Sequence, residues 1–422
     1  RSMNKDIKII LPPKLYICSS RENQTIQTDR EEFNIFFANI IQPYSEDFDV
    51  FVNCKYGENL GHCWHIDQLP DSGTVFPLEI RLYDAYGVCL AEKKTMVETV
   101  AKQRNGEAFR VLAVGDSMTR SAKYLAHLAT KLYGIEFVGS RSFDKTIYHE
   151  GRGGWSFENY FHGTRENGDV TSPFLFPRDV SGKDYFGDLG YHRDIADALH
   201  DPYQFDGFKV EHPKDGQIVT DKNEAFRFEH GKMTQLEKNV SWEFSFSKYV
   251  ERQGLKDLNA VTILMGANDL QICPYEESDK RIAKFMDNME RFVQSVREYS
   301  AALPIVINLP VLGAEQHAWG KQMGCRGTQK MYRFNILRAN QRLIKVYGNR
   351  ENEFIFLSPM FLNLDPDYGF PKEGYRVNKY ASDVVEYQSN WVHPNDNGYC
   401  QMGDALGGVL EKIRGLSSTK GG

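Results

Sequence analysis

The stretch FRVLAVGDSMTR, residues 109–120, decides the fold class of this chain. It begins as a short apolar run that ends in a glycine–aspartate turn. The next segment, residues 121–134, has the pattern of an amphipathic helix with Leu125, Leu128 and Leu132 on one face. A short apolar strand that leads directly into such a helix is the unit from which parallel sheets are built. We therefore predict an α/β fold from this point onward.

The alternation of strand and helix continues toward the C-terminus. Four further apolar runs predict strands: IEFVGS (135–140), NAVTILMG (259–266), LPIVINLP (303–310) and EFIFLSP (353–359). Segments with helical periodicity lie at 278–300, 328–348 and about 398–414. Helices between short strands imply a parallel sheet covered on both faces, and active sites of such sheets lie beyond the carboxyl ends of the strands.

The first part of the chain has a different character, because three segments favour strands with no helical segment between them: EFNIFFANII (32–41), FDVFVNC (48–54) and FPLEIRLYDAYG (76–87). We predict a small antiparallel β-sandwich domain over residues 1–105 and an α/β domain over residues 106–422. Within the second domain, about 156–242 lacks periodicity, and we predict that it is an insertion over the active edge of the sheet.

The composition is that of an ordinary globular protein. The chain has 422 residues, of which 41% are hydrophobic and 26% charged, with a formal net charge of -6 and a pI of about 6.1. This balance gives no electrostatic reason to expect nucleic acid or an anionic membrane as a partner. No apolar run reaches the ~18 residues that a transmembrane helix needs.

No metal or cofactor is expected. The seven cysteines are scattered and form no CxxC pair, which argues against a disulfide framework or a zinc ribbon. The short stretch GHCWH, with His62, Cys63 and His65, lacks a second ligand cluster and is read as a strand. The opening Arg1–Met3 resembles a cloning remnant, so a removed signal peptide and a periplasmic or extracellular location are expected; a cytoplasmic location stays open.

Four short motifs fall at the ends of predicted strands or in the loops after them: VGDSMTR (114–120), HEGRGGWSF (149–157), LMGANDLQ (264–271) and NWVHPNDNGY (390–399). The first presents Ser117 at a strand-to-helix turn, and the glycines of the second can offer bare backbone N–H groups. The third carries Asn268, whose amide can stabilise a developing negative charge. The fourth carries His393. Each motif alone has a structural explanation such as a helix cap or a turn.

Together and in this order, the motifs resemble those of the SGNH hydrolases, also called the GDSL esterases, over roughly Phe109 to Gly415 apart from the insertion. The resemblance implies a flavodoxin-like three-layer parallel sheet and a serine esterase without a cofactor. It implies that Ser117 is the nucleophile and His393 the base. The oxyanion hole would consist of the backbone N–H groups of Ser117 and Gly154 and the side chain of Asn268, with Gly154 preferred to Gly153.

The chain departs from the family pattern at Asn390, where the family has an aspartate three residues before the histidine. The Asn390 carbonyl could accept the His393 Nδ1–H, as in Cys–His–Asn sites. Alternatively, a backbone carbonyl or a carboxylate such as Asp383 or Glu386 orients the ring, or the site is degraded. The first two readings are favoured because the serine, the histidine and both other oxyanion positions are intact. We predict that Asn390 Oδ1 or a main-chain carbonyl contacts the imidazole.

The predicted substrate is an acetyl or similar short ester on a carbohydrate. The expected β-sandwich and the aromatic content of the insertion support it, since aromatic faces suit sugar rings. These aromatic residues are Trp155, Phe174, Phe176, Tyr185, Phe186, Tyr191, Tyr203 and Phe205. Trp155 is the predicted substrate-binding residue, although any single ring is more often part of a core. A glycan-binding pseudoenzyme and a lipase or thioesterase of the same fold are the alternatives, and the oligomeric state stays open.

Overall fold

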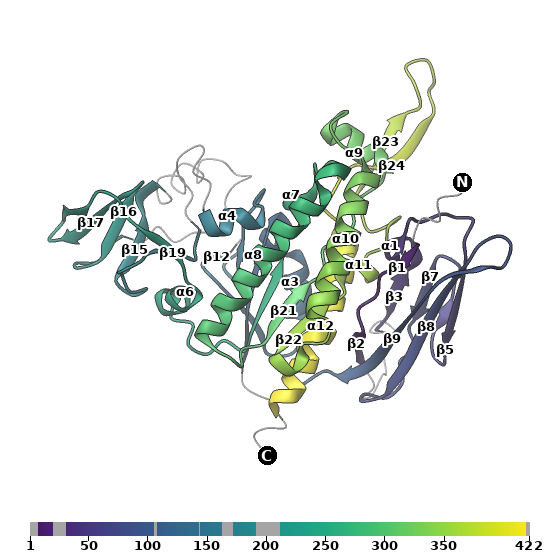
Figure 1. Ribbon diagram of the computed structural model, residues 1–422, viewed down its shortest axis with the longest axis horizontal. Helices are drawn as coiled ribbons and strands as arrows, with labels where there is room; N and C mark the ends of the chain where they lie inside the picture. The colour runs from purple at the N-terminus through teal and green to yellow at the C-terminus, as the bar shows by residue number, and fades with distance from the viewer. Residues whose placement is uncertain are drawn as a thin grey trace.

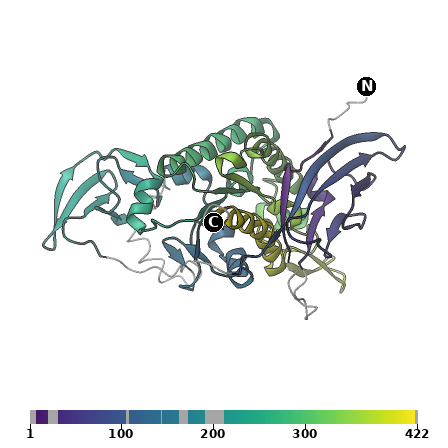
Figure 2. The same cartoon turned by 90° about the horizontal axis from the view of Figure 1, so that it is seen from below.

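The computed structural model describes residues 7–19, 31–104, 108–142, 144–162, 172–190 and 212–418. Its centre is a parallel sheet with helices α8 and α10 on one face and α3 and α12 on the other (Figures 1 and 2). The principal strands are β10 (Phe109–Gly115), β11 (Ile135–Val138), β20 (Ala260–Leu264), β21 (Ile305–Asn308) and β22 (Ile355–Ser358). They pair in parallel in the order β11-β10-β20-β21-β22, which confirms the predicted flavodoxin-like sheet.

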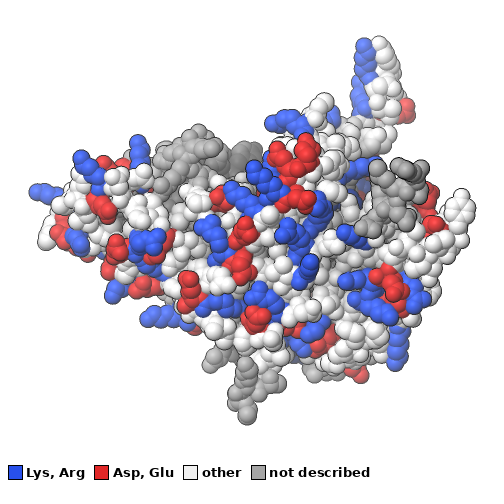
Figure 3. Space-filling view, viewed as in Figure 1, with Lys and Arg blue, Asp and Glu red and all other residues white. Residues whose placement is uncertain are grey.

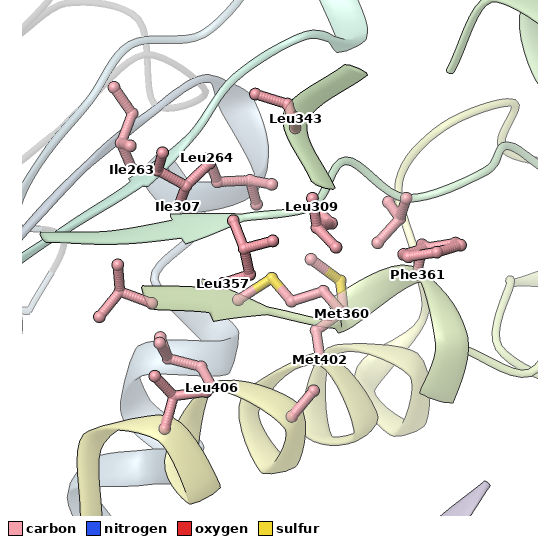
Figure 4. Close-up of a cluster of buried hydrophobic side chains, with 14 of the residues drawn as sticks. Ile263, Leu264, Ile307, Leu309, Leu343, Leu357, Met360, Phe361, Met402 and Leu406 are labelled. Atoms are coloured by element: carbon pink, nitrogen blue, oxygen red, sulfur yellow. The ribbon is translucent and has the colours of Figure 1, made fainter. Parts of the chain in front are cut away.

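The helices form where the apolar periodicity predicts them. These are α3 (Lys123–Lys131), α8 (Ser278–Tyr299), α10 (Gln329–Tyr347) and α12 (Asp396–Ser418). Each buries one stripe against the sheet, and Figure 4 shows Met402 and Leu406 of α12 pointing toward Leu357 and Met360. Among the described residues, no helix combines the length and the apolarity that a bilayer crossing requires.

Two short strands extend the sheet beyond the prediction: β12 (Arg141–Ser142) and β13 (Tyr148–Gly151). β13 pairs in parallel with the carboxyl end of β10, so that Gly151 is the partner of Gly115. Its sequence, YHEG, has no apolar run, which is why periodicity does not predict it. This pairing places the start of the glycine motif beside the turn that carries Ser117.

The N-terminal part forms separate β-sheets, as predicted. The four-stranded sheet has the order β2 (Lys14–Ser19), β9 (Cys89–Ala101), β8 (Val75–Tyr83) and β5 (Asp49–Cys54). The second sheet contains β3 (Phe33–Phe36), β7 (Cys63–Ile66) and β6 (Glu58–Asn59), and β1 (Lys8–Ile9) pairs with β4 (Ile41–Gln42).

Two details of this region correct the prediction. β2 and β9 are parallel, so the four-stranded sheet is not wholly antiparallel. The segment 32–41 is not one strand, because the single-turn helix α1 (Phe37–Ile40) separates β3 from β4. The GHCWH stretch does contribute a strand, β7, and the ring of His65 is hydrogen-bonded through Nδ1 to Asn34 Oδ1 at 2.8 Å.

The N-terminal sheets pack directly on the α/β body, and the two parts share one hydrophobic core. A Cβ atom at Gly408 of α12 would lie 2.0 Å from the carbonyl oxygen of Tyr16 in β2, so glycine permits the close approach. Asn39 Nδ2 also donates to the carbonyl oxygens of Phe361 and Leu364, at 2.8 and 2.7 Å. The predicted domain boundary at residue 105 stays a prediction.

The described part of the predicted insertion consists of α4 (Phe157–His162) and the strand pair β14 (Leu175–Pro177) and β19 (Trp242–Phe244), followed by α6 (Phe246–Gln253). It also contains a four-stranded sheet of β15 (Tyr185–Asp188), β16 (Ile218–Asp221), β17 (Glu224–Glu229) and β18 (Lys232–Glu237). This sheet lies to one side of the central sheet rather than over its carboxyl ends (Figure 1), and the expected position of the insertion as a whole stays a prediction.

The remaining elements are short and lie in the connections: α2 (Ser117–Arg120), α7 (Ala267–Leu270), η2 (Tyr275–Glu277), α9 (Gln316–Met323), η3 (Glu351–Glu353) and α11 (Met360–Asn363). A hairpin of β23 (Lys372–Arg376) and β24 (Val384–Gln388) projects from the body (Figures 1 and 3). Figure 3 also shows basic and acidic side chains interspersed over that face.

Candidate active site

The serine motif forms a tight turn at the end of β10. Asp116 is the N-cap of α2, and its Oδ1 accepts the backbone N–H of Met118 at 2.9 Å. Ser117 is the first residue of that helix. A Cβ atom at Gly115 would lie 2.1 Å from Thr119 Oγ1, so a glycine is required at the end of the strand. The turn therefore presents Ser117 beyond the carboxyl end of the first strand.

The structure brings Ser117 and His393 together although 276 positions separate them in the sequence. The Ser117 Oγ and His393 Nε2 atoms are 2.7 Å apart, which is hydrogen-bond distance. The imidazole is half-buried, and burial lowers the pKa of His393 below its usual value. A neutral imidazole at neutral pH can accept the serine proton.

The predicted hydrogen bond between Asn390 Oδ1 and the imidazole of His393 is not formed. Instead, Asn390 Oδ1 accepts the backbone N–H of His393 at 2.9 Å and that of Val392 at 3.3 Å. The reason is local, because an asparagine side chain readily folds back onto the N–H groups two and three residues later. The predicted main-chain acceptor is not found either, since no residue in the described ranges accepts a hydrogen bond from His393 Nδ1. Asp383 and Glu386 are exposed on the projecting hairpin.

The loop that carries His393 is fixed by a second segment, residues 313–319. Gln388 and Glu315 exchange two hydrogen bonds, because the side chain of each accepts the backbone N–H of the other at 2.6 Å. The backbone N–H of Ala314 donates to the carbonyl oxygen of Trp391 at 2.9 Å. Trp319 and Trp391 pack edge to face, with 4.9 Å between ring centroids. These positioning contacts are long-range pairings that sequence reasoning missed.

The glycine motif and the asparagine motif also meet. Asn268, in α7 after β20, donates from Nδ2 to the carbonyl oxygen of Trp155 at 2.9 Å. This bond uses one of the two amide hydrogens and leaves the other for a further acceptor. Gly154 has φ +74°, which suits glycine, and no atom lies within 4 Å of the position of a Cβ there. The backbone N–H of Arg152 donates to Gly115 O at 2.9 Å and links the glycine motif to β10.

The Trp155 ring, which was predicted to bind substrate, is buried, and its burial does not favour that role. The side chain is only 6% exposed and packs edge to face on Tyr160 at 5.1 Å. It is the carbonyl oxygen of Trp155 that reaches the site. Four of the other aromatic residues in the predicted set are buried in the core of the insertion, which argues against their predicted contact with sugar: Phe174, Phe176, Tyr185 and Phe186. Tyr191, Tyr203 and Phe205 lie outside the described residues.

A buried cluster of hydrogen-bonded polar side chains holds the glycine motif in place. The Glu150 carboxylate pairs with Arg152 at 2.8 Å, and both side chains are almost fully buried. Tyr249 donates its hydroxyl proton to Glu150 at 2.6 Å, and the Tyr160 hydroxyl donates to the carbonyl oxygen of Gly115 at 2.7 Å. A charged pair within the HEGRGG stretch is the signal that could have revealed this cluster, since buried charges require partners.

Two buried carboxyl groups flank the site. Asp269 Oδ1 accepts the backbone N–H of Phe157 at 2.9 Å, as Asp116 accepts that of Met118. In the described part of the chain, the Oδ2 atoms of Asp116 and Asp269 are buried without a hydrogen-bond partner. Burial raises the pKa of each carboxyl to about 7, and the charge of Asp269 adds to the rise at Asp116.

A parallel α/β sheet with a serine–histidine pair at the carboxyl end of its first strand defines a hydrolase of the serine type. Residues 111–406 match the family described as GDSL-like Lipase/Acylhydrolase, and the chain belongs to this family. The protein is therefore a carboxylic ester hydrolase. A comparison with curated proteins finds no match.

Three solved structures are similar to this chain at low identity. A possible lipase from Chitinophaga pinensis is 12% identical, covers 72% of this chain and 98% of its own, and has a TM-score of 0.35. A family 3 carbohydrate esterase from Clostridium thermocellum is 10% identical, with coverage of 73% and 98% and a TM-score of 0.34. Est24, a carbohydrate acetylesterase from Sinorhizobium meliloti, is 12% identical, with coverage of 73% and 99% and a TM-score of 0.30.

Proposed function

We propose that the protein removes acetyl or similar short acyl groups from a carbohydrate, with Ser117 as nucleophile and His393 as base. The observation that carries the proposal is the 2.7 Å separation of Ser117 Oγ and His393 Nε2. The hydroxyl proton passes to Nε2 while Oγ attacks the ester carbonyl carbon. The carbonyl oxygen becomes an oxyanion, which the backbone N–H groups of Ser117 and Gly154 and the Asn268 amide stabilise.

The tetrahedral intermediate collapses when the bond to the sugar oxygen breaks. His393 returns the proton from Nε2 to this oxygen, and the sugar leaves as an alcohol while the acyl group stays on Ser117. Water then attacks the acyl-enzyme with His393 again as base, which releases the carboxylic acid and restores the serine. These reaction steps need no metal or cofactor.

We infer that the site works as a serine–histidine dyad. Asn390 accepts a hydrogen bond from the backbone of His393 rather than from its ring. The reciprocal hydrogen bonds between Glu315 and Gln388 hold the same loop. This rigidity takes over part of the orienting role that a carboxylate has in a triad. The missing charge leaves the imidazolium less stabilised, so we expect a slower enzyme than a triad would give.

A short acyl group on a carbohydrate is the substrate class that we propose in preference to a long lipid chain. A periplasmic or extracellular location, where glycans are exposed, remains part of the proposal.

The experiment is a chain-length series of p-nitrophenyl esters from acetate to decanoate, with wild type and Ser117→Ala. We expect acetate to be the best substrate and Ser117→Ala to lose at least ~10³-fold in kcat/KM. Equal hydrolysis by both proteins would disprove the nucleophile, and a preference for decanoate would indicate a lipase. A glycan-binding pseudoenzyme predicts no covalent labelling of Ser117 by a fluorophosphonate probe.

A further inference from the structure

A groove with a volume of about 610 Å³ lies between the insertion and helix α8, away from the Ser117–His393 pair. Its lining residues come from α4, from β19, from Arg178 directly after β14 and from α8. They are Phe161, Arg178, Trp242, Glu243, Phe244, Asp287, Glu290, Arg291, Gln294, Ser295 and Glu298. None of them has a role in the proposed chemistry.

One wall of the groove is a polar stripe on α8. Asp287, Arg291, Gln294 and Glu298 follow one another at intervals of four, three and four residues, so they share one face of the helix. Asp287 and Glu298 are exposed and make no hydrogen bond or ion pair with any residue in the described ranges. Their carboxylates can therefore accept hydrogen bonds from a ligand.

The opposite wall is aromatic. Trp242 and Phe244, at the two ends of β19, are half-buried and line the groove. Phe161 lies beneath them, with its ring centroid 4.4 Å from that of Phe244. The guanidinium of Arg291 stands 3.9 Å from the centroid of the Phe161 ring and connects the two walls.

This lining selects the chemistry of the ligand. Two basic and four acidic side chains disfavour an anion, and their number disfavours an acyl chain. Aromatic faces combined with free carboxylates suit a neutral molecule with apolar faces and hydroxyl groups at its edges. We propose that this groove binds a stretch of the glycan chain, at a distance from the sugar whose ester is hydrolysed. The inference rests on the proposed carbohydrate function and adds a second contact for the same substrate.

The groove and the catalytic residues are joined by one short helix. Phe157, at the start of α4, donates its backbone N–H to Asp269, the neighbour of Asn268. Phe161, four residues later, lines the groove. Because α4 has six residues and is about 9 Å long, a glycan chain whose ester is bound at Ser117 would have to extend past this helix to reach the groove.

The test compares Trp242→Ala and Asp287→Ala with two controls in turns of the N-terminal part, Tyr86→Ala and Glu46→Ala, which are exposed and lie outside the groove. For each protein the measured quantity is kcat/KM on acetylated xylan divided by kcat/KM on p-nitrophenyl acetate. We expect the ratio to fall about 3- to 10-fold in each groove variant, through a higher KM for the polymer, and to stay constant in the controls. Melting curves show whether Trp242→Ala is folded, and Asp287 lies at the surface, where truncation does not disturb the core.

An unchanged ratio in both groove variants would contradict glycan binding in the groove, but it would not contradict the esterase activity or the carbohydrate substrate. A wild-type enzyme that hydrolyses p-nitrophenyl acetate but neither O-acetylated xylan nor O-acetylated chitin oligosaccharides would instead contradict the carbohydrate assignment, and the groove proposal with it. The two failures are distinguishable because only the second appears in the wild type.

Discussion

The Oδ1 atom of Asn390 accepts the backbone N–H of His393 at 2.9 Å and so stabilises the loop rather than the imidazole. In a triad, the side chain three residues before the histidine would act on Nδ1 and select the tautomer. Here the same position has become a backbone cap. The ring is held instead by its burial and by its contact with Ser117 Oγ.

Substitutions at Asn390 therefore have a specific expected pattern. Asn390→Asp retains an acceptor for the backbone N–H and is expected to keep kcat/KM on p-nitrophenyl acetate within about threefold of wild type. Asn390→Ala loses the hydrogen bond and is expected to cost about 1 kcal/mol of stability and up to about tenfold in kcat. A loss near ~10⁴-fold in Asn390→Ala, as expected when a tautomer is no longer held, would contradict the backbone role.

The pH dependence of activity follows from the lowered pKa of His393. The catalytic form is the neutral imidazole, and burial disfavours the charged form, so kcat/KM should rise with pH and reach its plateau below neutrality. The inflection is expected below pH 6.5 in a profile measured from pH 4.5 to 8 with p-nitrophenyl acetate. An inflection above pH 7 assigned to His393 by NMR would indicate an unseen carboxylate partner.

Asp269 makes stability depend on pH. Its folded pKa of about 7 lies above the ordinary value of 3.8, so the folded state keeps a proton that the unfolded state loses. This contribution to the free energy of unfolding is present below pH 4 and is lost as the pH rises toward 7. Asp269→Asn keeps an acceptor for Phe157 but carries no charge, so it should raise the melting temperature at pH 8 by a few degrees, about 1–2 kcal/mol. Equal destabilisation of the variant at pH 5 and pH 8 would contradict this.

The reciprocal pair of Glu315 and Gln388 should control the position of His393. Gln388→Ala leaves the backbone N–H of Glu315 without its acceptor and is expected to cost about 1–3 kcal/mol and to lower kcat more than it raises KM. Glu315→Gln is the matched control, because an amide oxygen can still accept the N–H of Gln388. If both variants lose stability without any change in kcat, the pair has only a structural role.

Docking of the N-terminal sheets depends on Gly408. An alanine there would place Cβ 2.0 Å from Tyr16 O and force the sheet away from α12, with an expected loss of about 2 kcal/mol or more in thermal unfolding. Gly320 in α9 is the control, since nothing lies within 4 Å of its Cβ position and alanine favours a helix. A Gly408→Ala protein as stable as Gly320→Ala would show that the two parts are loosely attached.

Several features were predictable because they depend on residues that are close in sequence. Apolar runs and helical stripes located β10, β20, β21 and β22 and the helices between them, since burial of one face produces those periods. The order of the four motifs along successive strands predicted that Ser117 and His393 would belong to one site. Strand β13 escaped prediction because it has no apolar run, and because its buried Glu150 depends in part on Tyr249, 99 positions away in the chain.

By itself, the sequence determined most of the strand and helix pattern and the family, and it proposed Ser117 and His393 as the reactive side chains, because these features depend on local spacing and side-chain chemistry. Only the tertiary structure decided which atoms those side chains contact. It buried Trp155, paired Glu315 with Gln388 beside the loop that carries His393 and placed Trp242 in a groove beside α8. The physical reason is that hydrogen-bond direction and burial are set by packing between segments far apart in the chain, which no local pattern records.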